Sequence, residues 1–167
     1  MELQIVLARE GGAADAVSHA LGRKVRVEKR ASGAPYIKGD EHYLSLSHKD
    51  DKMVVALSDK PVGVDIEKLV DKAAYYRIAD NYFAEKIREG DCEGFFRGWT
   101  RREAFGKMLG KGLDGDVMRM DMSADKLEYQ GSTVYFAEKR VGDYMITVAG
   151  YYPDGELKIL GEEQDEE

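Results

Sequence analysis

Apolar positions recur along the chain with two different spacings, which together predict a mixture of helices and strands. Spacings of three and four residues predict helices over residues 13–21, 73–88 and about 93–109. Alternation of apolar and polar residues, or a short apolar run, predicts strands at 3–8, 24–28, 36–37, 43–47, 53–57, 62–67, 134–137, 144–152 and 157–160.

The order of these segments favours the α+β class with mostly antiparallel strand pairing. The turn 58–61 separates two strand-like runs, 53–57 and 62–67, so we expect these two strands to form a hairpin. Residues 118–122 alternate methionine with charged residues, which predicts a strand whose methionines pack into the core. No fixed repeat or low-complexity linker divides the chain, so we expect one domain over residues 1–161.

The composition suits a globular domain rather than a membrane or disulfide-rich protein. The chain has 167 residues, 43% of them hydrophobic, and its one cysteine, Cys92, cannot form an intramolecular disulfide. No apolar run reaches the roughly 18 residues that a membrane helix needs, and the first residues lack the basic region of a signal peptide. We therefore expect a cytoplasmic protein without a membrane partner.

Charge is spread unevenly over the sequence. Residues 162–167 hold five acids, and removing these acids changes the formal net charge from −7 to −2, so we expect a solvated acidic tail there. The acidic balance argues against nucleic acid as a partner. Two basic runs, 23–30 and 95–112, each sum to +4. Such a run is either a solvated face or a site for an anionic ligand, and both interpretations remain open.

The first candidate for chemistry is the pentapeptide Gly63-Val64-Asp65-Ile66-Glu67. Residues i and i+2 of a strand point the same way, so Asp65 and Glu67 share one face while Val64 and Ile66 share the other. Like charges this close repel each other unless a cation or strong hydrogen-bond donors lie between them. A solvent-facing strand with incidental acids would show the same alternation, so the pentapeptide alone leaves both interpretations open.

The second candidate lies on the predicted helix 93–109. Trp99, Glu103 and Lys107 are spaced i, i+4 and i+8, so they form one row, with Arg102 beside it. A Glu followed four residues later by Lys is also a common surface pair worth only a few tenths of a kcal/mol. A tryptophan in the same row predicts partial burial, and a partly buried carboxylate needs a metal or a positive partner.

The sequence gives little support for a zinc site, a Ser/His/Asp triad or a phosphate-binding loop. A strand ends at Ser47-His48, where the imidazole is either a ligand contact or an ordinary surface group. The three histidines, His19, His42 and His48, have no zinc-ligand spacing and form no recognisable Ser/His/Asp arrangement. No Gly-rich phosphate loop stands between a strand and a helix.

Taken in order, the motifs resemble those of a known enzyme family. Gly-x-Pro-Tyr-Ile begins at Gly33, Leu-Ser-Leu-Ser-His at Leu44 and Gly-Val-Asp-Ile-Glu at Gly63, and Trp-Thr-x-Arg-Glu-Ala-x-x-Lys-x-x-Gly-Lys-Gly-Leu begins at Trp99. This order resembles the 4′-phosphopantetheinyl transferases, above all the larger, surfactin-synthetase-activating branch. The resemblance covers about residues 22–113.

The resemblance implies a Mg²⁺-dependent transfer of the phosphopantetheine arm of coenzyme A to a serine of an apo acyl or peptidyl carrier protein, with release of 3′,5′-adenosine bisphosphate. It assigns Asp65, Glu67 and Glu103 as the metal ligands. Glu103 would also accept the serine proton, and Lys107 would contact the pyrophosphate. The implied coenzyme A contacts are Ser47, His48, Arg102, Lys107 and Arg30.

Two departures from the family pattern weaken this assignment. The family's Gly-Lys-Pro motif is Gly33-Ala34-Pro35 here, so Arg30 or a neighbouring cation would have to replace the missing lysine. The region before Ser47 is also shorter than is usual for the branch. A non-catalytic coenzyme A- or carrier-binding protein is therefore an alternative, as is a Mg²⁺-dependent phosphohydrolase using the same carboxylates.

The implied fold has two similar halves, about 1–68 and 69–161, each with an antiparallel sheet, related by a pseudo-twofold axis with the active site between them. Because one chain supplies both halves, a monomer is expected rather than the trimer of the small-enzyme branch. Carrier proteins are generally acidic, so a basic patch of Arg97, Arg101 and Lys111 is expected to help dock one.

Overall fold

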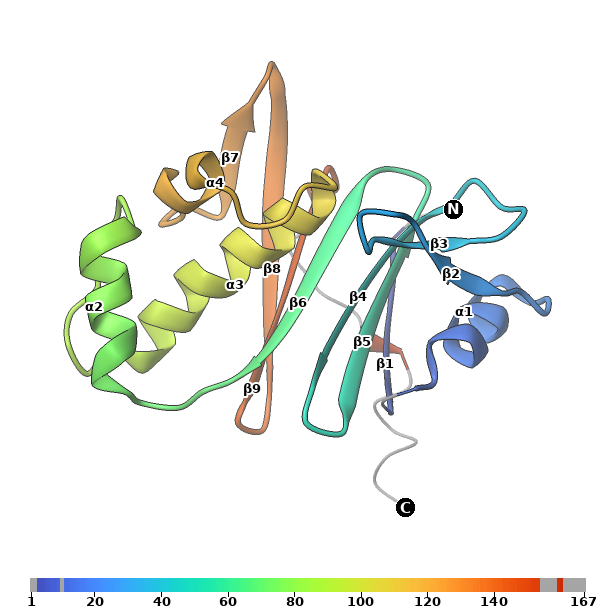
Figure 1. Ribbon diagram of the computed structural model, residues 1–167, viewed down its shortest axis with the longest axis horizontal. Helices are drawn as coiled ribbons and strands as arrows, with labels where there is room; N and C mark the ends of the chain where they lie inside the picture. Colours follow the sequence, from blue (N-terminus) through green and yellow to red (C-terminus); the bar gives the residue numbers. More distant parts are fainter. Residues whose placement is uncertain (1–2, 10, 154–158, 161–167) are drawn as a thin grey trace.

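Two four-stranded sheets lie side by side in the computed structural model, which describes residues 3–9, 11–153 and 159–160 (Figure 1). The strand order of the first sheet is β10-β1-β5-β4, and only the β1–β10 pair is parallel. Its strands are β1 (Gln4–Arg9), β4 (Tyr43–Lys49), β5 (Lys52–Ser58) and β10 (Ile159–Leu160).

The second sheet has the order β6-β9-β8-β7 and is antiparallel throughout. Its strands are β6 (Val62–Lys68), β7 (Lys126–Tyr129), β8 (Ser132–Val141) and β9 (Tyr144–Gly150). The α+β class with antiparallel sheets is therefore confirmed. The chain changes sheets at residues 59–61, ahead of the expected boundary near residue 68.

The expected hairpin between strands 53–57 and 62–67 is wrong. Both edges of β5 are already occupied, one by β1 and the other by β4, so β6 pairs with β9 in the other sheet. The hairpin that does form joins β4 to β5 through a tight turn at Asp50 and Asp51, where Asp50 has a φ of 54°. Asp tolerates this left-handed conformation better than most residues.

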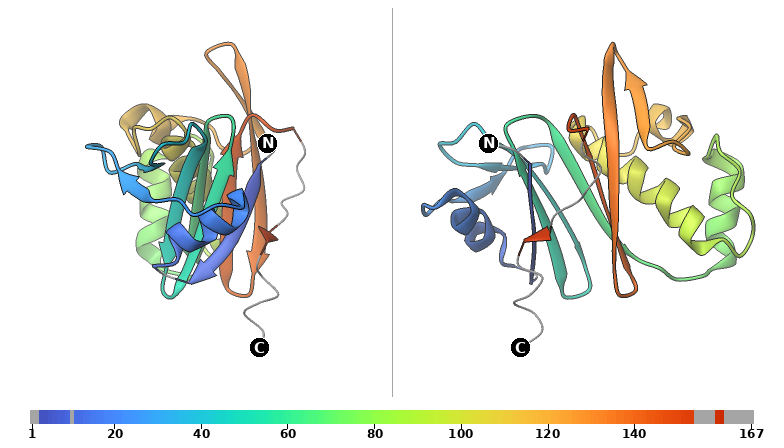
Figure 2. Two further views of the ribbon diagram at one scale, coloured as in Figure 1. Left: turned by 90° about the vertical axis from the view of Figure 1, so that its right-hand side faces the viewer. Right: turned by 180° about the vertical axis from the view of Figure 1, so that it is seen from behind.

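In the part of the chain that the structure describes, four helices and a small hairpin surround the sheets. They are α1 (Ala13–Leu21), α2 (Ala73–Tyr82), α3 (Cys92–Met108), α4 (Gly115–Arg119) and the hairpin of β2 (Val27–Lys29) with β3 (Pro35–Ile37). Helix α1 packs on the outside of the first sheet, the hairpin lies beside β4, and α3 crosses β6 and β9 (Figures 1 and 2). The Asp91 side chain caps α3 by accepting a hydrogen bond from the Gly94 N–H.

The helix predicted over 93–109 is confirmed, whereas two other predictions need correction. Helix α2 ends at Tyr82, six residues earlier than expected, because Phe83 turns to an extended conformation and buries its ring against Phe95 of α3. Residues 115–119 form α4 instead of a strand, since Asp114 caps a helix there. The three methionines still pack into the core, although they come from this helix and the following coil.

Helix α3 lies unusually close to β6 because Gly63 has no side chain. A Cβ at Gly63 would lie 1.7 Å from the Ala104 carbonyl oxygen. On β9, the Thr147 hydroxyl is 2.7 Å from that of Thr100, which ties the helix to the next strand of the same sheet. These contacts bring the middle of α3 directly over the face of β6 that carries Asp65.

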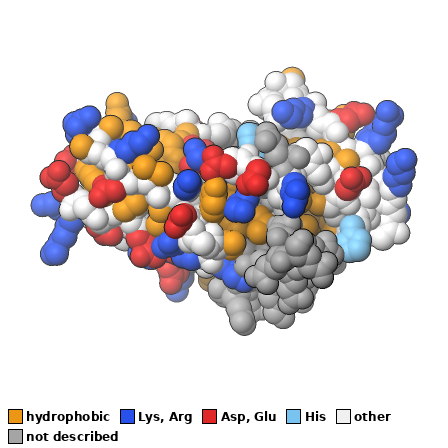
Figure 3. All heavy atoms as spheres, turned by 90° about the horizontal axis from the view of Figure 1, so that it is seen from below, with side chains coloured by type: hydrophobic (Ala, Val, Ile, Leu, Met, Phe, Trp, Pro, Cys, Tyr) orange, Lys and Arg blue, Asp and Glu red, His pale blue; other side chains and the backbone are white. Residues whose placement is uncertain are grey.

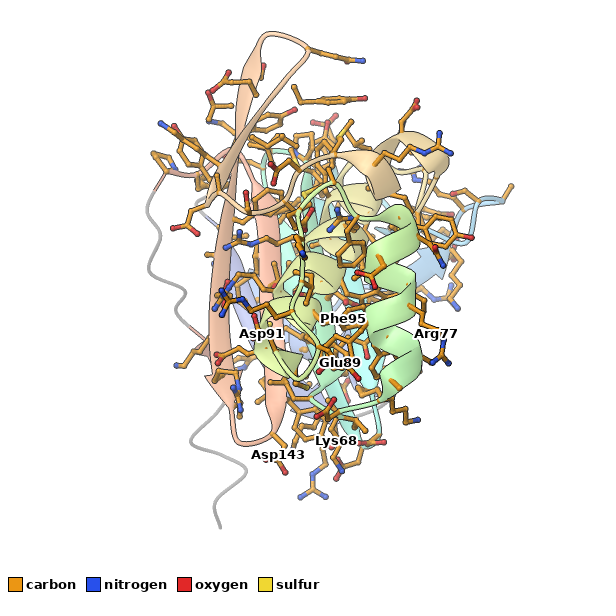
Figure 4. All side chains as sticks on the ribbon, turned by 90° about the vertical axis from the view of Figure 1, so that its left-hand side faces the viewer. Lys68, Arg77, Glu89, Asp91, Phe95 and Asp143 are labelled. Carbon is orange, nitrogen blue, oxygen red and sulfur yellow. The ribbon has the colours of Figure 1, made fainter. Side chains whose placement is uncertain are left out.

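Aromatic rings fix the other end of α3 against α2. Phe95 stacks on Tyr75 of α2, on Phe83 and on Trp99, with ring centroids 4.9, 5.6 and 6.1 Å apart. Figure 4 shows Phe95 beside α2. Among the described residues, no helix has the length and apolar character needed to cross a membrane. The predicted acidic tail, 162–167, lies outside the described residues.

Candidate active site

The site lies at the seam where the two sheets meet, which is formed by β4 and β6. These strands belong to different sheets and are not hydrogen-bonded neighbours. Two serine side chains bridge them instead: the Ser45 Oγ accepts from the Val64 N–H and the Ser47 Oγ from the Ile66 N–H, each at 3.1 Å. Because Ser45 meets Val64 and Ser47 meets Ile66, the two strands run in the same direction.

Asp65 is the most buried charged group of the site. Its side chain lies under α3, and its Oδ1 accepts a hydrogen bond from the Ser47 hydroxyl at 3.0 Å. The pKa of Asp65 is raised to about 8, chiefly by burial. The Lys107 ammonium opposes this shift, and the negative charges of Glu67 and Glu103 add to it. Of the two interpretations that the pentapeptide left open, the solvent-facing strand with incidental acids is therefore excluded for Asp65, since helix α3 covers both it and Gly63.

Glu67 and Glu103 are half-buried beside Asp65. Burial raises the pKa of both carboxyl groups, and the Glu67 charge raises that of Glu103 further. Lys107 acts in the opposite direction on both groups, and Lys49, 3.8 Å from Glu67, lowers the pKa of Glu67. A hydrogen bond with the Trp99 side chain also lowers the pKa of Glu67. The strand pentapeptide and the helix row thus form one electrostatically coupled group.

Lys107 connects the two sheets. Its Nζ donates to the Leu46 carbonyl on β4 and to the Val64 carbonyl on β6, both at 3.1 Å, and lies 3.7 Å from the Asp65 Oδ1. An ammonium has three N–H donors, and two are used by these carbonyls. One donor and the partly exposed end of the side chain therefore remain available to an anion.

The carboxylates suit a hard divalent cation. Asp65 Oδ2 is buried and, among the residues that the structure describes, has no hydrogen-bond partner. Among the described residues, no group of three or more His, Cys, Asp or Glu side chains is placed so that it could by itself hold a metal ion. Mg²⁺ does not require one, because it is commonly held by one or two carboxylates together with phosphate oxygens and water. An unpartnered carboxylate oxygen that is electrostatically coupled to two further acids fits such an ion.

Arg102 does not have the predicted role in coenzyme A binding. Its side chain is fully buried, and all five of its N–H groups are used. They bond to both Glu85 carboxylate oxygens at 2.7 Å and to the backbone carbonyls of Gly98, Met118 and Met120. The guanidinium also lies 3.7 Å from the centre of the Phe83 ring. It fastens α3 to the segments on either side of it and has no donor left for a ligand.

The predicted basic docking patch is not a surface of three unpaired cations, because its members are paired with acids within the protein and Arg101 is buried. Arg101 is buried and bonds to Asp125 and Glu138, while Arg97 bonds to Glu138. Lys111 pairs with Asp114 at 2.9 Å. Acidic and basic side chains are interspersed on the face shown in Figure 3. Arg101 and Arg102 thus serve the interior of the protein, whereas Arg97 and Lys111 are partly exposed members of ion pairs.

The remaining predicted contacts lie on the first sheet's side of the seam. His48 is exposed on β4, next to Ser47 but on the opposite face of the strand. Ser47 itself is buried and points at Asp65, so a direct contact between its hydroxyl and coenzyme A is not what the structure shows. Arg30 is exposed at the β2–β3 turn, with its guanidinium 4.8 Å from the centre of the Tyr36 ring.

Sequence reasoning did not find the bridging role of Ser45 and Ser47. The available signal was the alternation Leu-Ser-Leu-Ser, which places two hydroxyls on one face of a strand otherwise built for a core. It indicates a buried face that needs hydrogen bonds, but nothing in the sequence identifies β6 as the partner.

Fold and site together define a class of protein. Two mostly antiparallel sheets meet along a seam, and three acids and a lysine lie near the place where a helix crosses it. The family model of the 4′-phosphopantetheinyl transferase superfamily matches residues 61–149, a little over half of the chain. The chain belongs to this superfamily. The matched stretch contains the strand acids Asp65 and Glu67 and the helix residues Glu103 and Lys107.

Several curated proteins are similar to this chain. The 4′-phosphopantetheinyl transferase gsp of Aneurinibacillus migulanus is 33% identical over an alignment of 93 residues that covers 51% of this chain and 38% of that protein. The 4′-phosphopantetheinyl transferase psf-1 of Bacillus pumilus is 36% identical over 93 residues, 52% of this chain and 40% of that protein. The L-aminoadipate-semialdehyde dehydrogenase-phosphopantetheinyl transferase of Xenopus laevis is 26% identical over 133 residues, 67% of this chain and 44% of that protein. The chain thus spans about two fifths of the length of these relatives.

Proposed function

We propose that this protein transfers the 4′-phosphopantetheine group of coenzyme A to a serine of an apo acyl or peptidyl carrier protein. The observation that carries the proposal is the meeting of Asp65 and Glu67 with Glu103 and Lys107 at the seam, since the first pair comes from a strand and the second from a helix some 40 residues later. The superfamily match spans the same residues.

The reaction exchanges one phosphorus–oxygen bond for another. The carrier's serine oxygen attacks the phosphorus that bears the pantetheine arm, and the bond from that phosphorus to the bridging oxygen of the pyrophosphate breaks. The leaving group is 3′,5′-adenosine bisphosphate, which keeps the electron pair of the broken bond. Glu103 accepts the serine proton, directly or through water. Its half-buried position and raised pKa bring it closer to the basicity that a general base needs near neutral pH.

Asp65, Glu67 and Glu103 would hold Mg²⁺, with the unpartnered Oδ2 of Asp65 as one ligand. When bound, the ion neutralises pyrophosphate charge and so favours departure of the phosphate leaving group. Lys107 binds a pyrophosphate oxygen through the N–H that the two carbonyls leave free. His48 and Arg30 contact phosphates of coenzyme A from the exposed side of the first sheet.

The direct test is incubation of the protein with coenzyme A, Mg²⁺ and a panel of apo carrier proteins, read by mass spectrometry. A gain of one phosphopantetheine group on a carrier supports the proposal, and the carrier that reacts identifies the pathway served. Adenosine bisphosphate released without any carrier would instead indicate a phosphohydrolase.

Glu103→Gln is the matched variant for this assay. The amide keeps the shape and half-buried packing of the side chain but can neither accept the proton nor supply a charged ligand. We expect transfer to fall at least about 1,000-fold, because both roles are removed, while the melting temperature stays within a few degrees of the wild type. Retention of full activity would show that the helix carboxylate has been assigned wrongly.

One observation favours a second function, a non-catalytic protein that binds coenzyme A or a carrier. Ala34 lacks the positive charge that its family position usually has. The β2–β3 turn nevertheless brings Arg30 next to it, with the Arg30 N–H donating to the Ala34 carbonyl at 2.8 Å. Arg30→Ala should therefore weaken coenzyme A binding measured by calorimetry. Binding of coenzyme A without mass gain on any carrier would favour the second function.

We further propose that the protein acts as a monomer in the cytoplasm. One chain supplies both sides of the seam, so the site needs no second copy. The single cysteine gives no reason to expect an oxidising compartment.

A further inference from the structure

We infer that Ser47 is a positioning residue that orients the Asp65 carboxylate toward the metal, rather than a contact to coenzyme A. The inference rests on the proposed function and concerns how its metal site is built. Three observations support it: the direction of the Ser47 hydroxyl, the unequal surroundings of the two Asp65 oxygens, and the presence of a second serine on the same strand that lacks this contact.

The hydroxyl of Ser47 has its direction fixed by two partners. Its oxygen accepts from the Ile66 N–H at 3.1 Å, and its proton is donated to the Asp65 Oδ1 at 3.0 Å. A serine has one proton to give, so none remains for a phosphate. The partners are consecutive residues of β6, which means that one side chain of β4 holds both the backbone and the carboxylate at this point.

The two oxygens of Asp65 have different surroundings. Oδ1 receives the Ser47 hydrogen bond and lies 3.7 Å from the Lys107 Nζ. Oδ2 is buried and has no hydrogen-bond partner among the described residues. Because it is held through Oδ1, the carboxyl group of Asp65 cannot turn without losing the Ser47 hydrogen bond. Oδ2 is thereby kept free, in the position where we propose that the metal binds.

Ser45 provides a control within the same strand. It is also buried, lies two residues before Ser47, and accepts from the Val64 N–H at the same 3.1 Å. Removing either hydroxyl leaves one β6 N–H without its partner across the seam. Only the removal of Ser47 also frees a carboxylate. The difference between the two variants therefore isolates the contact with Asp65 from general damage to the seam.

The experiment compares wild type, Ser47→Ala and Ser45→Ala as full chains. Mn²⁺ serves as the probe, and its binding is measured by electron paramagnetic resonance with and without coenzyme A. We expect Ser47→Ala to bind Mn²⁺ about tenfold more weakly, the usual effect of losing a partner of a metal ligand. Ser45→Ala should stay within twofold of wild type, while the two variants show similar losses in melting temperature.

Should Ser47→Ala not fold, Ser47→Cys replaces it, because a thiol is close in size but a weak donor. Weakening of Mn²⁺ binding by about threefold or more relative to Ser45→Ala would then support the inference. Equal affinities in the Ser47 and Ser45 variants, with a wild type that binds Mn²⁺ and modifies a carrier, would overturn the inference alone. A wild type that binds neither Mn²⁺ nor coenzyme A and modifies no carrier would overturn the proposed function instead.

Discussion

At the scale of single residues, the site is built from side chains that fit badly in a metal-free protein. Asp65 is almost wholly buried and receives one hydrogen bond, with a lysine at 3.7 Å that is already bonded to two carbonyls. The shift of its pKa to about 8 measures how strongly the fold disfavours the charged form. A bound cation would stabilise the charged form of Asp65, so the free-energy cost of burying that charge favours cation binding.

The first residue-scale prediction concerns pH. An unfolded Asp ionises near its ordinary pKa of 3.8, whereas Asp65 in the fold stays protonated until about pH 8. Between these values the unfolded state binds fewer protons, so the contribution of Asp65 to stability is complete below about pH 4 and is lost as the pH rises to 8. With metal removed by a chelator, Asp65→Asn should gain stability over wild type across this range, by about 10 °C in melting temperature at pH 8.

Thermal unfolding in a chelating buffer at a series of pH values measures this difference in melting temperature between Asp65→Asn and wild type. Near pH 4 both side chains are uncharged, so the two proteins should melt within a few degrees of each other. Melting curves that shift in parallel, with a gap that is the same at pH 4 and pH 8, would show that Asp65 is ionised throughout.

The second residue-scale prediction concerns Arg102. Arg102→Lys keeps the charge but replaces five directed N–H groups with a single ammonium, which leaves part of the Glu85 carboxylate and several carbonyls without donors. We expect a loss of about 3 kcal/mol in the free energy of unfolding, measured in urea. Affinity for coenzyme A, measured at low temperature where the variant is folded, should be unchanged. Normal stability with weaker binding would restore Arg102 as a ligand contact.

At the scale of elements, the distance between α3 and β6 decides whether the helix acids reach the strand acids. That distance depends on Gly63, the first residue of the Gly-Val-Asp-Ile-Glu motif, which meets the backbone of Ala104 and Met108. A glycine here is needed for close approach rather than for a special φ, as the contact with the helix backbone shows. The motif therefore combines a packing requirement with two ligands.

Gly63→Ala tests this requirement. Its Cβ would overlap the Ala104 carbonyl oxygen and lie 2.6 Å from the Met108 nitrogen, so the helix must move away from the strand. We expect a loss of about 3 kcal/mol in stability and, in the protein that remains folded, weaker Mn²⁺ binding. Gly115→Ala is the matched control, because nothing lies within 4 Å of a Cβ at the start of α4. Equal melting temperatures for the two variants would contradict the close packing.

The sequence was a better guide to the helices and strands themselves than to which of them pack or pair together. The apolar spacing predicted helix α3. Period-two alternation placed Asp65 and Glu67 on one face of a strand, and the i, i+4 spacing placed Glu103 and Lys107 in one row. The pairing of β6 with β9 could not be predicted in this way. Alternation along a strand shows which of its faces is buried, but not which other strand is its hydrogen-bonded neighbour. The burial of Arg101 and Arg102 was also missed, since their acidic partners, Glu85, Asp125 and Glu138, lie 17 to 37 residues away in the sequence.

At the scale of the whole molecule, the two sheets share one apolar core. The cluster beneath the seam takes Ile5, Leu7, Val54 and Ala56 from the first sheet and Val62, Val64, Ile66, Ile146 and Val148 from the second. Neither sheet can therefore separate without exposing apolar surface of both, at roughly 25 cal/mol per Å². The two halves therefore have separate sheets but share this apolar cluster.

We accordingly expect a single unfolding transition in urea. Trp99, the only tryptophan, reports on α3 and the second sheet through its fluorescence, while far-ultraviolet circular dichroism reports on both sheets. The two signals should change with the same midpoint and slope. Loss of the fluorescence signal at a lower urea concentration than the dichroism would show that the second sheet unfolds by itself.

The parallel pairing of β10 with β1 has a consequence for how the protein is made. The ribosome releases β1 first, yet the strand that pairs with its outer edge at Ile5 and Val6 lies at residues 159–160. Throughout synthesis that edge presents unpaired N–H and C=O groups to any extended chain nearby. A nascent copy stalled before residue 159 would thus be a template for strand addition, and aggregation of incomplete chains is the hazard that this topology carries.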